Sequence, residues 1–102
     1  MISLIEQRRS DLAALCHRHR VERLEVFGSA ADGTFESDHS DLDFLVNYLP
    51  SAEEHIDDAY FGLLHDLEDL FHCKIDLVME RAIRNPYFRA GVNQSRQVVY
   101  GA

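Results

Sequence analysis

VFGSAADGTFESDHSDLDFLV, residues 26–46, is the stretch of sequence from which the fold and the chemistry of this chain are inferred. A first apolar run ends at Gly28-Ser29, and a second apolar run contains Asp41 and Asp43. Successive side chains of a β-strand point to opposite faces, so residues two apart share a face. We therefore expect Asp41 and Asp43 to project together from a strand, while the alternate apolar residues project into a core, namely Leu42, Phe44 and Val46.

This arrangement of two acids after a Gly-Ser turn indicates a site for a metal-bound nucleoside triphosphate. Two neighbouring carboxylates repel each other unless a positive charge lies between them, and hard divalent cations prefer oxygen ligands. The Gly28-Ser29 turn can present backbone N–H groups and a hydroxyl group to a phosphate. A Gly-Ser pair by itself is more often only a turn, but with the acids at this distance we favour the phosphate interpretation.

A third acid, Asp76, lies in the apolar run Lys74-Ile75-Asp76-Leu77-Val78. A carboxylate in the middle of an apolar strand costs free energy unless it is paired or ligating. That cost distinguishes Asp76 from the acids of the helix predicted over residues 51–71, which mostly lie off its apolar stripe and are expected to be solvated.

These residues resemble the signature of the DNA polymerase β-like nucleotidyltransferases: Gly28-Ser29, eleven intervening residues, Asp41-Leu42-Asp43, and a third acid, Asp76, on a later strand. Nearly the whole chain is similar to the smallest members, the minimal nucleotidyltransferase (MNT) domains. The resemblance implies an α/β polymerase β-like nucleotidyltransferase fold, in which a small mixed sheet carries helices mainly on one face. Residues 1–102 would form a single minimal nucleotidyltransferase domain.

The resemblance also implies roles for individual residues. Asp41, Asp43 and Asp76 would be the catalytic acids and would hold two Mg²⁺ ions, and Asp76 would complete the site of the ion that activates the acceptor hydroxyl. Gly28 and Ser29 would bind the terminal phosphates of ATP, and a further residue, Ser40, is included among the nucleotide-binding candidates.

The function implied is the Mg²⁺-dependent transfer of NMP, most often AMP from ATP, to a hydroxyl of a protein partner. Similar domains are commonly antitoxins of HEPN-type toxins. One alternative is a non-catalytic antitoxin that neutralises a HEPN RNase by contact, and a weaker one is an aminoglycoside-like small-molecule nucleotidyltransferase. The chain departs from the family at Ala30-Ala31-Asp32, where an arginine is common. Asp32 either weakens triphosphate binding or points to water.

The remaining patterns predict the order of the elements. A capping box, Ser51 with Glu54, is expected to start the central helix, and Asn85-Pro86 is expected to start the last one. A helical turn at residues 29–32 should end at Gly33 and lead into a polar loop over 34–40. The predicted helices cover residues 3–19, 51–71 and 85–96, and the predicted strands cover 23–27, 41–46, 74–79 and 97–100.

Composition restricts the possible partners and the compartment. The formal net charge of −8 argues against a general nucleic-acid grip, which needs a basic surface. It suits cations or a basic protein partner, although most of this charge is expected to serve solubility. Cys16 and Cys73 are expected to be reduced residues of a cytoplasmic protein. We expect neither a signal peptide nor a membrane-spanning segment, and a homo-oligomer is left open.

Overall fold

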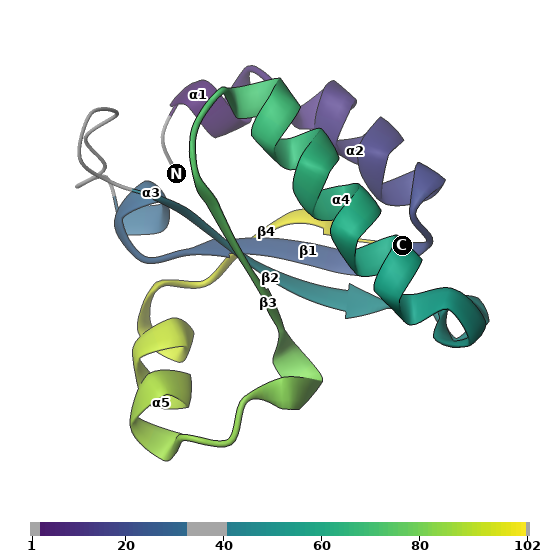
Figure 1. The fold of residues 1–102 in the computed structure, drawn as a ribbon. Helices are drawn as coiled ribbons and strands as arrows, with labels where there is room; N and C mark the ends of the chain where they lie inside the picture. Colours follow the sequence, from purple (N-terminus) through teal and green to yellow (C-terminus); the bar gives the residue numbers. More distant parts are fainter. Residues whose placement is uncertain (1–2, 33–40, 102) are drawn as a thin grey trace.

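The computed structural model describes residues 3–32 and 41–101, which form a four-stranded mixed sheet with helices on both faces (Figure 1). The order of the strands across the sheet is β3-β2-β1-β4. β1 pairs antiparallel with β2 and β4, whereas β2 and β3 run parallel. The strands are β1 (Val21–Phe27), β2 (Leu42–Tyr48), β3 (Ile75–Met79) and β4 (Gln97–Gly101).

The helices are distributed unequally over the two faces, as predicted. Figure 1 shows α1, α2 and α4 on one face of the sheet and α5 on the other, so the second face is only partly covered. A four-residue helix, α3, follows β1, and two short 3-10 helices complete the order of elements. The bounds are α1 (Ser3–Glu6), α2 (Arg9–Arg18), α3 (Ser29–Asp32), η1 (Pro50–His55), α4 (Ile56–Phe71), η2 (Glu80–Ala82) and α5 (Pro86–Ser95).

β2 lies between β1 and β3, and its alternation separates the two faces of the sheet. Leu42 and Phe44 are fully buried in the main core, beneath α2 and α4. Leu45 points to the opposite face and belongs to a second cluster with Phe27 of β1 and Val92 of α5. The prediction that the even-numbered apolar residues of this strand enter the main core is confirmed.

The prediction of one helix over residues 3–19 is wrong, because this segment forms two helices, α1 and α2. At Arg8 the backbone takes φ −111° and ψ 15°, and α2 starts at the next residue. Ile5 and Leu12 are both fully buried. They are seven residues apart, close to two helical turns, so the apolar pattern continues across the break and does not reveal it.

Other boundaries also differ from the prediction, among them the start of β1, which is Val21. β2 starts at Leu42, so Asp41 precedes the strand instead of lying inside it. Ser51 does not cap a helix, because Leu49 is the N-cap of η1 and Pro50 occupies its first turn. Proline suits that first position, since its missing N–H would have no intrahelical partner there.

The cap predicted at Asn85 is confirmed. Its Oδ1 accepts hydrogen bonds from the backbone N–H groups of Tyr87, at 2.8 Å, and Phe88, at 3.3 Å. The predictions for Gly33, the loop 34–40 and Ser40 lie outside the described residues. Within residues 3–32 and 41–101, no helix is both long and apolar enough to cross a bilayer.

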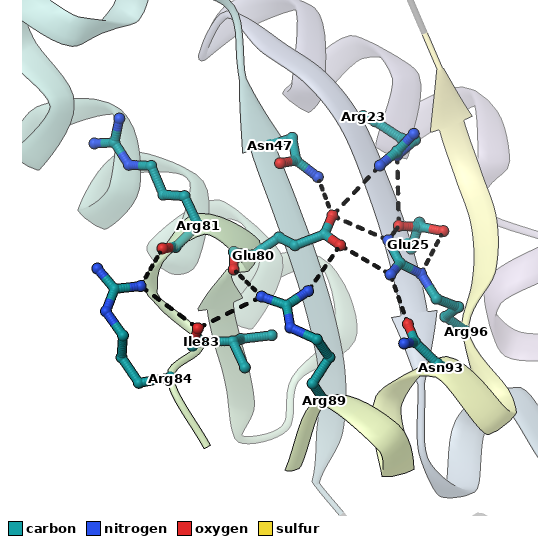
Figure 2. A network of polar contacts seen from close by, with 10 residues as sticks. All are labelled: Arg23, Glu25, Asn47, Glu80, Arg81, Ile83, Arg84, Arg89, Asn93 and Arg96. Carbon is teal, nitrogen blue, oxygen red and sulfur yellow. Dashed lines mark hydrogen bonds and ion pairs between the residues drawn. The ribbon is translucent and has the colours of Figure 1, made fainter. Parts of the chain in front are cut away.

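A network of ion pairs holds the end of α5 and the start of β4 against the sheet. Arg96 donates from Nε to Glu25 Oε1 at 3.2 Å and from Nη1 to Glu80 Oε2 at 2.9 Å. Arg23 and Asn47 also donate to Glu80, and Figure 2 shows the two carboxylates converging on the Arg96 guanidinium. The hydrogen bond from Arg96 is the main cause that lowers the pKa of Glu80 to about 2.

Gly62 of α4 provides a test of how α2 packs on α4. A Cβ at Gly62 would lie 2.7 Å from Cε1 of His19, whose Nε2 lies 2.6 Å from Asp66 Oδ2. Alanine normally stabilises a helix interior by about 1 kcal/mol relative to glycine. We expect Gly62→Ala to lower the free energy of unfolding by about 1 kcal/mol instead, because the displaced imidazole loses its bond to Asp66.

In a His19→Ala background, the same Gly62→Ala change should raise the free energy of unfolding by about 1 kcal/mol. Urea unfolding of the four proteins of this double-mutant cycle measures the reversal of sign. An equal effect of Gly62→Ala in both backgrounds would show that the imidazole does not restrict this position.

Candidate active site

Asp43 and Asp76 are direct neighbours on the sheet face that α5 partly covers. The register aligns Asp43 with Phe27 of β1 on one side and with Asp76 of parallel β3 on the other. Asp43 is half-buried in the central part of the sheet, whereas Asp76 is exposed because β3 is an edge strand. The sequence pattern predicts that Asp76 bears the cost of burial, whereas in the structure Asp43 bears it.

Burial and repulsion both act on the Asp43 carboxyl group. Desolvation is the largest cause that raises the pKa of Asp43 to about 6, followed by a side-chain hydrogen bond with Asp76 and by the charges of Asp76 and Asp41. A hydrogen bond between two carboxyl groups requires that they share a proton. These two groups therefore provide oxygen ligands at a position that favours a bound proton or cation.

Asp41 contributes to this negative field but has a separate partner. Its Oδ2 lies 3.6 Å from Lys74 Nζ, and both side chains are exposed. Among the described residues, no three His, Cys, Asp or Glu side chains are arranged to hold one metal ion. The donor chemistry of Asp43 and Asp76 suits a hard cation, and Asp41 would join them only after leaving Lys74.

Gly28 contacts Asp43 directly and connects the turn after β1 to α5. Its φ is +72°, and a Cβ placed there would lie 2.6 Å from Asp43 Oδ2. Its backbone N–H donates a hydrogen bond to Ser95 Oγ at 2.8 Å. Only glycine adopts this φ without strain and leaves room for the carboxylate, so Gly28 of the predicted turn lies directly beside Asp43.

The residues after this turn form the short helix α3. Ser29 is its first residue and is half-buried. Ala30 and Ala31, which follow Ser29 in this helix, are buried in the main core.

We expect Gly28→Ala to affect stability and activity together. The methyl group must displace the Asp43 carboxylate and adopt a strained positive φ, so the free energy of unfolding should fall by about 1 to 3 kcal/mol. The nucleotide transfer that the family resemblance implies should fall at least about tenfold, because an active-site group moved by about 1 Å loses its geometry. Gly101→Ala is the matched control, since its Cβ would make only an ordinary contact at 3.9 Å. Urea unfolding measures the loss of stability and a transfer assay measures the loss of activity. An unchanged transfer rate with Gly28→Ala would contradict the predicted effect on activity.

Two hollows meet at Asp43 and Phe88. The first, of about 340 Å³, also includes Asp76 and Tyr60. The second, of about 300 Å³, includes Gly28 and the face of α5. Ser29 and Asp41 line neither of these hollows.

Sequence reasoning missed Ser95 and Lys74. Ser95 is 67 residues from Gly28 and carries no local signal. The parallel register aligns Leu42 with Ile75, so Lys74 lies close to Asp41. Placing Asp43 beside Asp76 on parallel strands would have predicted this neighbour.

Residues 10–99 match the family model described as a nucleotidyltransferase domain. The chain belongs to this nucleotidyltransferase family. The expected resemblance and the expected enzyme class are therefore confirmed: the protein is a nucleotidyltransferase with an α/β nucleotidyltransferase fold.

Individual relatives are similar over most of the nucleotidyltransferase. The proposed protein adenylyltransferase MJ0128 of Methanocaldococcus jannaschii is 31% identical over 80 residues, which are 78% of each chain. The structure of a proposed minimal nucleotidyltransferase is 31% identical, with a TM-score of 0.65 over 90% of this chain and 89% of that one. The fold also matches a complex of a tri-AMPylated Shewanella oneidensis HEPN toxin with its MNT antitoxin, with a TM-score of 0.62 and 18% identity over 96% of this chain and 73% of that chain.

Proposed function

We propose that this nucleotidyltransferase transfers AMP from ATP to a hydroxyl group of a protein partner, and that it acts as the antitoxin of a HEPN-type toxin in the cytoplasm. The observation that carries this proposal is the close approach of Gly28 to Asp43, whose carboxyl group is paired with that of Asp76. The name of the M. jannaschii relative and the AMPylated toxin in the S. oneidensis complex support the type of acceptor. The net charge of −8 suits a basic partner.

In this proposal the acceptor oxygen attacks the α-phosphorus of ATP in line with the bond to the bridging oxygen. The new O–P bond forms as the bridging bond breaks, the proton of the acceptor hydroxyl passes to a carboxylate of the site, and pyrophosphate leaves. Asp41, Asp43 and Asp76 would hold Mg²⁺, which supplies stabilisation of the charge on the attacking and leaving oxygens when bound. Asp76, on the exposed edge strand, is the carboxylate closest to where an acceptor enters, and Gly28 and Ser29 bind the terminal phosphates.

Asp41 can join the other two acids at low cost. Its pair with Lys74 is exposed at both ends, with side-chain exposures of 39% and 72%. Exposed pairs of this kind contribute less than about 1 kcal/mol. The Asp41 carboxylate can therefore leave Lys74 and bind a divalent cation together with Asp43 and Asp76.

A second candidate is an antitoxin that neutralises its toxin by contact alone. The observation in its favour is that the three acids are not already arranged around one point among the described residues. The two candidates differ in whether the carboxylates are required for neutralisation.

The deciding experiment incubates the purified protein with Mg²⁺, ATP labelled at the α-phosphate, and the protein that is co-expressed with it. We expect label on the partner with the wild-type protein and none with an Asp41→Asn/Asp43→Asn variant that remains folded by circular dichroism. Transfer by the double variant would overturn the assignment of the site. A wild-type protein that transfers nothing, together with a double variant that still protects cells from the toxin, would establish the contact-only antitoxin.

A further inference from the structure

One face of α5 lines the hollow that contains Gly28 and Asp43. Tyr87, Gly91 and Ser95 are spaced by four residues, so they lie above one another on the same face of the helix. All three line the hollow of about 300 Å³. At one end, Ser95 accepts the hydrogen bond from the backbone of Gly28.

Gly91, in the middle of this face, keeps the hollow open. A Cβ at Gly91 would meet no atom within 4 Å, so no neighbouring group requires glycine there. Glycine is nevertheless unfavourable in a helix interior. The absence of a side chain leaves the α5 backbone accessible from the hollow, and a larger residue would fill this space.

Tyr87, at the other end, presents an aromatic ring to solvent. The residue is 87% exposed, and the neighbouring Phe88 is 42% exposed. The Phe88 ring is fixed edge-on against Phe27, with ring centroids 6.1 Å apart. Aromatic rings of this kind provide stacking surfaces for nucleobases, and they do so with little sequence preference.

We propose that this face of α5 is the nucleoside subsite: the base stacks on Tyr87, the sugar passes over Gly91, and the phosphates extend toward Gly28 and Asp43. From Tyr87 to Ser95 the helix rises about 12 Å, a distance that an extended nucleoside triphosphate bridges. The inference rests on the proposed function, because it takes the triphosphate to bind at the Gly28 turn.

In this proposal the nucleotide binds in the hollow with Gly28, and the acceptor binds in the hollow with Asp76. Phe88 and Asp43 line both, but Tyr87 lines only the hollow with Gly28, and Asp76 lines only the other. The acceptor hydroxyl enters through the hollow with Asp76 and Tyr60, opposite the leaving pyrophosphate. Tyr87 is therefore the aromatic residue whose replacement separates nucleotide binding from acceptor binding.

The test measures the binding of AMP-PNP and of inorganic tripolyphosphate, each with Mg²⁺ and without any acceptor. Tyr87→Ala should lower the affinity for AMP-PNP about tenfold and leave the affinity for tripolyphosphate unchanged. Phe61→Ala is the matched control, because Phe61 is an aromatic residue of α4 that is 53% exposed and lines neither hollow. Equal weakening of both ligands, or an unchanged affinity for AMP-PNP, would overturn the subsite.

Gly91→Leu gives a second, independent readout. It should raise the melting temperature, because leucine is a better helix former than glycine and its Cβ meets open space. The affinity of this variant for AMP-PNP should nevertheless fall at least about tenfold relative to its affinity for tripolyphosphate, because the leucine side chain fills the place of the sugar. A more stable variant with unchanged affinity for AMP-PNP would overturn the inference. These measurements contain no transfer step, so a failure of the proposed transfer to protein is recognised separately.

Discussion

We expect Asp43→Asn to lower the rate of AMP transfer by about a thousandfold while making the folded protein more stable at pH 7.5. Asp43 lies between Asp76 and the Gly28 turn, where the proposed cation and α-phosphate must meet. Stabilisation of transition-state charge by a bound metal contributes several kcal/mol, and about 4 kcal/mol corresponds to a thousandfold in rate. Asparagine keeps the shape of the side chain but loses the charge.

The gain in stability follows from the direction of the pKa shift. The folded state raises the pKa of Asp43 from 3.8 to about 6, mainly through desolvation. The folded protein therefore binds a proton more strongly than the unfolded chain, and this group lowers stability as the pH rises from about 4 to 6. One pKa unit corresponds to about 1.4 kcal/mol. Because solvent reaches this half-buried carboxyl group, we expect Asp43→Asn to gain about 1 to 2 kcal/mol above pH 6 and little at pH 4.

Urea unfolding between pH 4 and 8 and single-turnover transfer assays measure the two effects. Asp69→Asn is the control, because Asp69 is an exposed acid of α4 and its replacement should change neither quantity. A stable Asp43→Asn variant with wild-type transfer would contradict the proposed role of the carboxylate. A variant that is less stable at pH 8 would contradict the cost that desolvation and the neighbouring acids impose on the charged Asp43 carboxylate.

Arg96→Met should have the largest effect on stability, a loss of about 3 kcal/mol. Methionine keeps the aliphatic volume of Arg96 but leaves Glu25, which is 5% exposed, and Glu80 without their main cation. Removing one partner of a buried ion pair costs about 3 to 5 kcal/mol, because a charge remains buried and uncompensated. We expect the lower end of this range, since Arg23 still contacts both carboxylates.

The same variant should change the response to acid. Glu80 has its pKa lowered from 4.5 to about 2, so its contribution is fully present above pH 4.5 and is lost as the pH falls toward 2. Arg96→Met should remove most of this acid sensitivity. Thermal unfolding at pH 7 and pH 3 measures this sensitivity of the stability to acid. Arg8→Met is the control, because Arg8 and Asp11 form an exposed ion pair that contributes little to stability. An equal loss of stability in the two variants would show that the network in Figure 2 contributes little.

Local patterns in the sequence predicted the strands, most of the helices and the buried face of β2. The alternation around Asp43 predicted the two faces of β2, and the order Asn85-Pro86 predicted the start of α5. These features depend on neighbours within a few residues, and the relevant rules are local ones. The Gly-Ser and paired-acid pattern indicated the family, which the comparison confirms.

The sequence by itself thus determined the family, the order of most elements and the set of acids that deserve testing. The tertiary structure alone decided that Asp43 bears the cost of burial, that Ser95 holds the Gly28 turn, and that Arg96 holds Glu25 from a position 71 residues away. The physical reason is that strand order and the parallel register of β2 and β3 choose which distant side chains become neighbours. The charges, hydrogen bonds and open space of the site arise only from those neighbours.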